Sequence, residues 1–377
     1  MSEETAGALP RPIRVLQLVL SLAPGGTERL VLEIAKRLPP PFASVACCLD
    51  FRGAWAEEME QHGIPVFTLG RTPGFHPSLG RRIARLVERE GIDVVHCHQY
   101  SPFVYTCIAK LLRPRTRVIF TEHGRLSDTP ISLKRRLVNG WLGRIPNRSF
   151  AVCRDLRRFL VAEGFPASRL EVAYNGIELG DVPTPADRGH ARAALGLGTG
   201  GFVVGTVARL DPVKSLSTLI EAFALVARSV PGATLVIVGD GPEREGLEAL
   251  AGARNLSASV LFSGHRSDAR ALLPAFDVYA NSSLTEGVSL TIVEAMAAAL
   301  PVVATSVGGN PEVVAADRTG ALVPPRDPHA LAAAIASLAA DEGRGRAWGT
   351  EGRRTAEDRF PFDRMLDLYA GAYLGRD

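Results

Sequence analysis

The sequence predicts an α/β protein with two Rossmann-like, doubly wound domains that face each other across a cleft. Short apolar runs typical of buried strands alternate with helical patterns along most of the 377 residues. This alternation is typical of parallel sheets that are covered by helices. It is interrupted by a stretch rich in Gly, Pro, Thr and Asp at residues 180–200. We interpret that stretch as a linker that also contains a short helix.

We expect the first domain to cover residues 1–182. Its strands are predicted at residues 13–20, 44–49, 66–69, 94–98, 118–124, 149–153 and 170–177. Its helices are predicted at residues 27–38, 54–62 and 78–90. A glycine pair after the first strand, Gly25 and Gly26, allows a ligand to approach the backbone at a helix start.

We expect the second domain to cover residues 183–359. Its strands are predicted at residues 202–208, 234–239, 260–262, 278–280 and 301–305, and its helices at 215–229, 242–253, 289–299 and 327–339. The amphipathic C-terminal stretch, residues 360–377, is predicted to be a helix that packs back on the first domain.

The charge is small overall but unevenly distributed. A net charge of +3 favours no nucleic-acid partner. Residues 1–180 hold 25 Lys and Arg against 17 Asp and Glu, whereas residues 181–377 have a net charge of −5. A basic first half suits an acidic substrate or a membrane surface, and a chance imbalance explains it equally well.

The cysteines and the N-terminus both favour the cytoplasm. The five cysteines are odd in number and match no zinc spacing, so free thiols in a reducing compartment are expected. The first residues are acidic and polar and have no apolar h-region, so we expect no signal peptide.

Residues 283–299 have the pattern of a loop that enters a helix. The backbone N–H groups of about residues 287–290 would be unpaired donors at a positive helix end, where a phosphate binds well. Glu286 and Glu294 lie on either side of this anion site along the chain, and carboxylates suit vicinal diols. The segment thus has the outline of a nucleotide-sugar site. Alternatively, Glu286 only caps the helix and Glu294 only lies on its solvent-exposed face.

Two cations follow the strand predicted at residues 202–208. Arg209 and Lys214 would lie at its carboxyl end, where they could neutralise a diphosphate and help it leave. A surface ion-pair role is the alternative for each of them. The sequence holds no Asp-x-Asp pair that would hold a divalent metal. We therefore expect neither a metal nor another cofactor to be required.

Histidines mark the carboxyl edge of the first sheet. His123 follows the fifth strand, where it could bond a sugar hydroxyl or serve only the structure. His96 and His98 alternate along the fourth strand, so both rings lie on one face. They favour a core or cleft-lining role over a metal site, because no third ligand is evident.

The segment 133–148 is basic, amphipathic and contains a tryptophan. It could lie on an anionic membrane surface. A solvated helix with extended arginine side chains explains the same pattern.

Taken together, the motifs resemble the retaining glycosyltransferases of family 4, which have the GT-B fold. The resemblance spans nearly the whole chain and rests on these motifs: Gly25-Gly26, Thr121-Glu-His123-Gly, Asn175-Gly-Ile, Ala208-Arg209 with Lys214, Val238-Gly-Asp240-Gly-Pro, Gly264-His265, and Glu286-(x7)-Glu294-Ala-Met-Ala. It implies metal-independent transfer of a sugar from a UDP- or GDP-sugar to a saccharide or lipid-linked acceptor, with retention of anomeric configuration. The run from Ser306 to Glu312 is similar to a subgroup associated with exopolysaccharide export.

The resemblance also implies roles for particular residues. Glu286 would contact the donor sugar, Glu294 the ribose, and His123 the donor sugar near the reacting centre. Further donor contacts are implied for Arg209 and Lys214 at the diphosphate, for the backbone at Gly25, Gly26, Gly287, Val288, Ser289 and Leu290, and for His265 and Arg266 at the base.

Two departures from the family pattern bear on donor identity. The lysine is usually followed by glycine, and here Ser215 follows it. The usual Gly-Phe-Gly after the first glutamate is here Gly287-Val288-Ser289.

Three other functions compete with this interpretation. A nicotinamide-dependent dehydrogenase would use Asp50 after the second strand, but the first turn lacks G-x-G-x-x-G. An epimerase of the same fold would release a free sugar without an acceptor. An inactive scaffold would need none of Arg209, Lys214, Glu286 and Glu294.

Overall fold

The structure is a computed structural model that describes residues 11–125 and 132–376. By their internal contacts these residues form two compact units. The first holds the residues up to 151, residues 157–173 and the residues from 366 on; the second holds residues 152–156 and 174–365. Each unit is described by itself.

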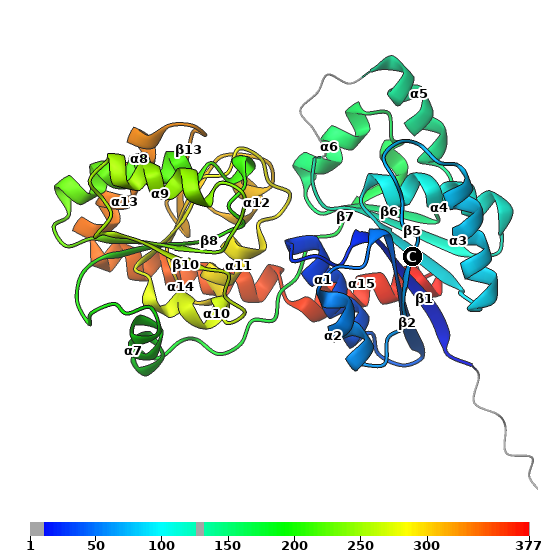
Figure 1. The fold of residues 1–377 in the computed structure, drawn as a ribbon, viewed down its shortest axis with the longest axis horizontal. Coiled ribbons are helices and arrows are strands. Elements are labelled where there is room, and N and C mark those ends of the chain that lie inside the picture. The colour runs from blue at the N-terminus through cyan, green and yellow to red at the C-terminus, as the bar shows by residue number, and fades with distance from the viewer. Residues whose placement is uncertain (1–10, 126–131, 377) are drawn as a thin grey trace, which may run out of the picture. The chain divides into compact units, whose positions relative to one another are not determined.

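The first unit is built on a seven-stranded sheet with the order β3-β2-β1-β4-β5-β6-β7, in which every pair is parallel. The strands are β1 (Ile13–Ser21), β2 (Phe42–Phe51), β3 (Val66–Thr68), β4 (Val94–His98), β5 (Arg117–Glu122), β6 (Arg148–Ala151) and β7 (Leu170–Val172). The helices are α1 (Gly26–Arg37), α2 (Trp55–Gln61), α3 (Ser78–Arg89), α4 (Tyr100–Leu112), α5 (Leu133–Leu142) and α6 (Arg154–Ala162). In Figure 1, α1 and α2 cover one face of this sheet, and α3 and α4 cover the other.

The second unit is built on a six-stranded parallel sheet with the order β10-β9-β8-β11-β12-β13. The strands are β8 (Val203–Val207), β9 (Thr234–Val238), β10 (Val260–Gly264), β11 (Val278–Asn281), β12 (Val302–Thr305) and β13 (Gly320–Val323). The helices are α7 (Pro185–Ala194), α8 (Leu216–Ser229), α9 (Arg244–Ala253), α10 (Ala269–Leu272), α11 (Leu290–Ala297), α12 (Asn310–Val313), α13 (Pro328–Ala340) and α14 (Glu342–Arg359). Figure 1 shows α8, α9 and α13 on one side of this sheet and α11 with α14 on the other.

The predicted fold class is confirmed, because each unit is a doubly wound parallel sheet. The chain passes from the first unit to the second between residues 173 and 174, whereas the sequence placed the boundary between 182 and 183. Tyr174 accounts for the difference: its hydroxyl donates to Glu312 at 2.7 Å, which ties the start of the connection to the second unit.

The C-terminal helix α15 (Phe362–Leu374) contributes its residues from 366 on to the first unit. Tyr369 and Tyr373 are buried there, and the ring of Tyr373 meets Phe42 edge-on at 5.6 Å. The guanidinium of Arg117 at the start of β5 donates to the carbonyl of Ala372 at 2.6 Å. The last turns of the chain therefore complete the first unit's core.

Several elements lack a signal in the sequence. Helix α4 is apolar on most sides and so has no amphipathic period, and β13 has only four residues. Helix α14 contains glycines at 343, 345, 349 and 352, which disfavour a helix. A Cβ at Gly349 would lie 2.0 Å from the carbonyl oxygen of Ala299, so the packing of α14 requires that glycine.

Helix α8 begins at a strained residue directly after Lys214. Ser215 is its N-cap, with φ +48° and ψ +44°, a left-handed conformation that costs a residue with a Cβ about 1 kcal/mol or more. Ser215 is 8% exposed, and its hydroxyl lies 2.8 Å from that of Thr218. The conformation explains why glycine is usual at this position, and the hydroxyl contact partly offsets the strain in this chain.

We predict that Ser215→Gly is more stable than Ser215→Ala by about 1 kcal/mol. Both variants lose the hydroxyl, but only glycine lacks the Cβ that is strained in the left-handed conformation. Denaturant unfolding of the two variants measures the difference. At Ser229, in the last turn of the same helix, the order should reverse because alanine is the better helix former. An alanine variant at 215 as stable as the glycine variant would contradict the prediction.

Candidate functional site

The parallel sheets decide where ligand-binding loops gather. The carboxyl ends of all strands in a parallel sheet lie at one edge, and ligands bind where the strand order reverses. In the second unit that point lies between β8 and β11, and in the first unit between β1 and β4. Lys214 and Glu286 follow β8 and β11, and Gly25-Gly26 follow β1.

Lys214 and Glu286 form an ion pair at the reversal point of the second sheet. The Lys214 ammonium lies 2.7 Å from Glu286 Oε1, and the two side chains are 26% and 9% exposed. The same Oε1 accepts hydrogen bonds from the Ser283 hydroxyl at 2.6 Å and the Asn281 amide at 3.3 Å. The carboxylate is therefore held by three donors, and the ammonium keeps one face toward solvent.

The loops that carry this pair are tied to each other through the backbone. The Ser282 hydroxyl donates to the carbonyl of Lys214 at 2.9 Å. The N–H of Leu284 donates to the carbonyl of Val213 at 2.8 Å. The loops after β8 and β11 thus hold each other, so the ion pair rests on a rigid frame.

A third loop, after β12, presses directly on Glu286. A Cβ at Gly308 would lie 1.9 Å from the carbonyl oxygen of Glu286, and one at Gly309 would lie 2.1 Å from that of Gly287. The N–H of Gly309 also donates to the Gly287 carbonyl at 2.9 Å. Only glycine fits at both positions, so the double glycine serves to place Glu286.

The start of α11 offers backbone donors beside the ion pair. Ser289 is the N-cap, but its hydroxyl makes no capping bond and instead lies 3.3 Å from the Thr291 hydroxyl. The backbone N–H groups of residues 287–289 make no hydrogen bond within the parts of the chain that the structure describes. Such a helix start can bind an anion.

The other predicted donor-binding residues lie on the same edge but do not join the ion pair. Arg209 is 63% exposed and pairs with Asp211. Glu294, on α11, lies 3.9 Å from the Arg270 guanidinium.

The residues predicted at the base follow β10 on the same edge. His265 is exposed, and Arg266 makes two hydrogen bonds to Asp268, at 2.7 and 2.8 Å. Among the described residues, the structure thus brings Lys214, Glu286 and the start of α11 together and gives Arg209 and Arg266 acidic neighbours of their own.

In the first unit, Gly25 and Gly26 lie at the start of α1. Gly25 is the N-cap, in extended conformation with φ −171°, and has no side chain to cap the helix. A Cβ at Gly25 would lie 2.3 Å from a carboxylate oxygen of Glu28, a flexible side chain. The extended backbone of Gly25 is one that any residue adopts, so the close neighbour of this glycine is the Glu28 carboxylate at the helix start.

His123 lies just after β5, at the end of a row of buried polar groups. Its Nε2 lies 3.0 Å from Nδ1 of His98, whose Nε2 lies 2.9 Å from Oε1 of Gln17. Burial lowers the pKa of His123 to about 3 and holds that of His98 well below its usual range, so both rings are neutral. Nδ1 of His123 is buried and has no hydrogen-bond partner among the described residues.

His96 belongs to the same layer. The centre of its ring lies 4.0 Å from that of His98, with the planes tilted by 34°, so both rings lie on one face as the alternation along β4 predicted. Its nitrogens lie 2.7 Å from the Tyr373 hydroxyl and 2.8 Å from the Thr121 hydroxyl. Across residues 11–125 and 132–376, no three His, Cys, Asp or Glu side chains are grouped closely enough to hold a metal.

Glu122, directly before His123, was not singled out by the sequence. It is 2% exposed, and burial raises its pKa to about 8, although the backbone N–H of His123 donates to it at 3.1 Å. The carboxyl braces the turn that carries His123. Three other residues that sequence reasoning missed, Asn281, Ser283 and Gln17, act through neighbours and have no motif of their own. The double glycine lies in the run Ser306–Glu312, which the sequence related only to a subgroup of the family.

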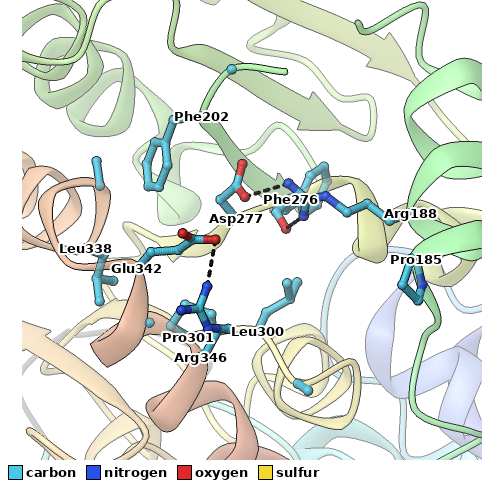
Figure 2. Close-up of a pocket in the computed structure, with 14 residues that line it drawn as sticks. Pro185, Arg188, Phe202, Phe276, Asp277, Leu300, Pro301, Leu338, Glu342 and Arg346 are labelled. Atoms are coloured by element: carbon cyan, nitrogen blue, oxygen red, sulfur yellow. Dashed lines mark hydrogen bonds and ion pairs between the residues drawn. The ribbon is translucent and has the colours of Figure 1, made fainter. Parts of the chain in front are cut away.

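A cavity of about 690 Å³ lies at the opposite edge of the second sheet (Figure 2). Phe202, Asp277 and Pro301 line it, and they precede β8, β11 and β12. The Asp277 carboxylate is satisfied by the Arg188 guanidinium at 2.6 Å and the N–H of Val203 at 2.7 Å. The cavity is thus a structural feature of the strand starts, away from the edge where ligands bind.

Comparison with known proteins relates both units of the chain to glycosyltransferase families. Residues 24–181 match the family described as Glycosyltransferase Family 4, and residues 187–355 match the family described as Glycosyl transferases group 1. A GDP-mannose-dependent alpha-(1-6)-phosphatidylinositol monomannoside mannosyltransferase of Mycobacterium tuberculosis is 32% identical over 318 residues, which cover 80% of each chain. The putative glycosyltransferase EpsD of Bacillus subtilis is 28% identical over 335 residues, covering 84% of this chain and 86% of EpsD.

Solved structures agree with these relatives. HepE of Anabaena, solved in complex with UDP-glucose, superposes with a TM-score of 0.83 at 27% identity, covering 95% of this chain and 98% of HepE. The agreement extends over both units, as do the motifs that carry Lys214, Glu286 and His123. The chain therefore belongs to the family 4 glycosyltransferases, with the GT-B fold of two Rossmann-like domains.

Proposed function

We propose that this glycosyltransferase binds a nucleotide-sugar at the carboxyl edge of the second sheet and transfers the sugar to a saccharide or lipid-linked acceptor. The Lys214–Glu286 pair beside the bare start of α11 carries this proposal. It sets a cation and free N–H donors, which suit a diphosphate, beside a carboxylate, which suits sugar hydroxyls. The predicted roles of Arg209, Glu294, His265 and Arg266 extend the same site toward diphosphate, ribose and base.

The leaving group requires positive charge as the sugar–phosphate bond breaks. Lys214, Arg209 and the N–H groups at residues 287–289 supply it, so the proposal uses no metal ion. The acceptor hydroxyl attacks the anomeric carbon from the side of the leaving group. The new carbon–oxygen bond forms as the bond to phosphate breaks, and a phosphate oxygen takes the hydroxyl proton. The anomeric configuration is retained because attack and departure take place on the same face of the sugar.

The relatives leave the donor base open. The mycobacterial relative is named as GDP-mannose-dependent, and HepE was solved with UDP-glucose. Thermal-shift measurements with UDP- and GDP-sugars select the donor. Mass spectrometry of products on free and lipid-linked acceptors then identifies the transfer, and NMR of the anomeric proton determines retention. Free sugar formed without an acceptor would favour an epimerase.

The relatives also support a role in cell-surface glycans. EpsD matches 84% of this chain over 86% of its own length, and the mycobacterial relative is named for a phosphatidylinositol monomannoside. We propose that the protein acts in cell-surface or exopolysaccharide synthesis on the cytoplasmic side of the membrane. No helix in residues 11–125 and 132–376 has the length and apolarity to cross a bilayer.

Removal of the Lys214 ammonium should lower the rate of transfer at least about 100-fold, because a preorganised charge at the leaving group is lost. Glu286→Ala should lower the rate by a similar factor, because the carboxylate predicted to contact the donor sugar is lost. Initial rates with the selected donor measure both. Lys36→Ala is the matched control, since Lys36 pairs with Glu58 at 2.9 Å with similar burial, in the first unit. Wild-type rates in Lys214→Ala would refute the site.

Helix α5 supports membrane contact by the segment 133–148. Its apolar side chains point outward: Leu133, Leu137 and Trp141 are 71%, 70% and 58% exposed. Leu137 and Trp141 border an apolar groove of about 980 Å³ whose wall includes Val104 on α4. Lys134 and Arg136 on the same helix are exposed. Outward apolar residues flanked by cations are typical of a helix that lies in a membrane interface.

We predict that the protein co-sediments with vesicles containing anionic phospholipid at low salt and much less with neutral vesicles. Leu137→Glu with Trp141→Glu should abolish pelleting, because the apolar face is lost. Val182→Glu, an exposed apolar residue of the second unit at 51%, is the control. Absence of wild-type pelleting at low salt would end the membrane proposal and leave the transfer proposal intact.

A further inference from the structure

A continuous row of buried hydrogen bonds crosses the first unit and ends at His123. From the C-terminal helix it runs from the Tyr373 hydroxyl to Gln17 Nε2 at 3.4 Å, from Gln17 Oε1 to His98 at 2.9 Å, and from His98 to His123 at 3.0 Å. Gln17 and His98 are fully buried, and Tyr373 and His123 are 3% and 8% exposed. The row spans β1, β4 and β5, so the sheet itself aligns its members.

The contacts of the Tyr373 hydroxyl determine the orientation of the Gln17 amide. Gln17 Nε2 lies 3.4 Å from the Tyr373 oxygen and can only donate, which leaves the Tyr373 proton for Nδ1 of His96, 2.7 Å away. The Tyr373 oxygen then accepts from Gln17 Nε2. The Gln17 carbonyl oxygen consequently faces His98 and can only accept.

The orientation of Gln17 determines which ring nitrogen of His98 and then of His123 carries the proton. Each neutral ring carries one proton. Because Gln17 Oε1 accepts, His98 Nε2 carries the His98 proton, and His98 Nδ1 presents a lone pair. That lone pair must accept from His123, so His123 Nε2 is protonated and His123 Nδ1 is an acceptor. This is the buried nitrogen for which residues 11–125 and 132–376 provide no partner.

We propose that Gln17 and His98 are positioning residues that hold His123 in its Nε2-protonated tautomer, so that Nδ1 accepts a hydrogen bond from a sugar hydroxyl. A buried acceptor without a donor is costly, which gives the site a preference for a ligand that brings an O–H group. The opposite tautomer would present an N–H there and would orient a hydroxyl the other way. The identity of the ligand as a sugar rests on the proposed function, whereas the tautomer does not.

The tautomer is measurable without substrate. Long-range proton–nitrogen NMR of protein labelled with 15N at histidine distinguishes a protonated Nε2 from a protonated Nδ1, with His123→Asn assigning the signal. We expect Nε2–H with a bare Nδ1 in the wild-type protein from pH 6 to 8. Nδ1–H on His123 in the wild-type protein would overturn the proposal, whatever the enzyme's activity.

Two substitutions at His98 separate positioning from packing. His98→Phe fills the space without an acceptor, so kcat should fall about tenfold, the loss expected for one hydrogen bond, and His123 should become a mixture of tautomers. His98→Asn keeps an acceptor near Nδ1 and should stay within about threefold of the wild type. UDP and GDP binding should be unchanged in both, because neither His98 nor its partner His123 is predicted to contact the nucleotide.

Equal losses in both His98 variants with an unchanged His123 tautomer would assign His98 a packing role and overturn the proposal. Should His98→Phe fail to fold, Gln17→Leu removes the acceptor at the other end of His98 and is judged by the same spectrum. If the wild-type protein transfers no sugar from any donor, the proposed function fails, and the NMR spectrum still decides the tautomer.

Discussion

The ion pair between Lys214 and Glu286 is the interaction around which the second unit's site is organised. A carboxylate that is only 9% exposed needs donors, and it finds an ammonium, a hydroxyl and an amide. The same groups suit the two ends of a sugar diphosphate. The pair thus keeps both charges in place before a ligand binds, and a ligand would exchange this contact for phosphate at the lysine and hydroxyls at the glutamate.

Close approach of backbones makes that arrangement rigid. The loops after β8, β11 and β12 come from neighbouring strands and are joined by backbone hydrogen bonds and by the contact of Gly308 with Glu286. Glycine lowers the stability of the folded protein, because it loses more conformational freedom on folding than any other residue. Here it permits a spacing that a methyl group would forbid, and so stability is exchanged for a fixed position of a functional carboxylate.

The two units use different chemistry at the same kind of edge. The second presents charges that keep contact with water, whereas the first presents neutral imidazoles removed from it. Burial lowers the pKa of His123 to about 3 and raises that of Glu122 to about 8, so both are neutral near pH 7. A neutral, hydrogen-bonded edge can orient hydroxyl groups without attracting ions, whereas an ammonium beside a helix start suits an anion.

The sequence by itself determined the alternation of strands and helices, the carboxyl-edge positions of Lys214, Glu286 and His123, and the family to which they belong. The alternation and the positions follow from local periodicity and spacing, and the family follows from the resemblance of the motifs. Helix α14, with its four glycines, and the supports at Gln17, His98 and Gly308 became evident only in the tertiary structure. Each depends on a partner far away in the chain, such as Tyr373 for Gln17 or Glu286 for Gly308. Local sequence patterns do not predict such long-range pairings, because burial and close contact arise only when the sheets form.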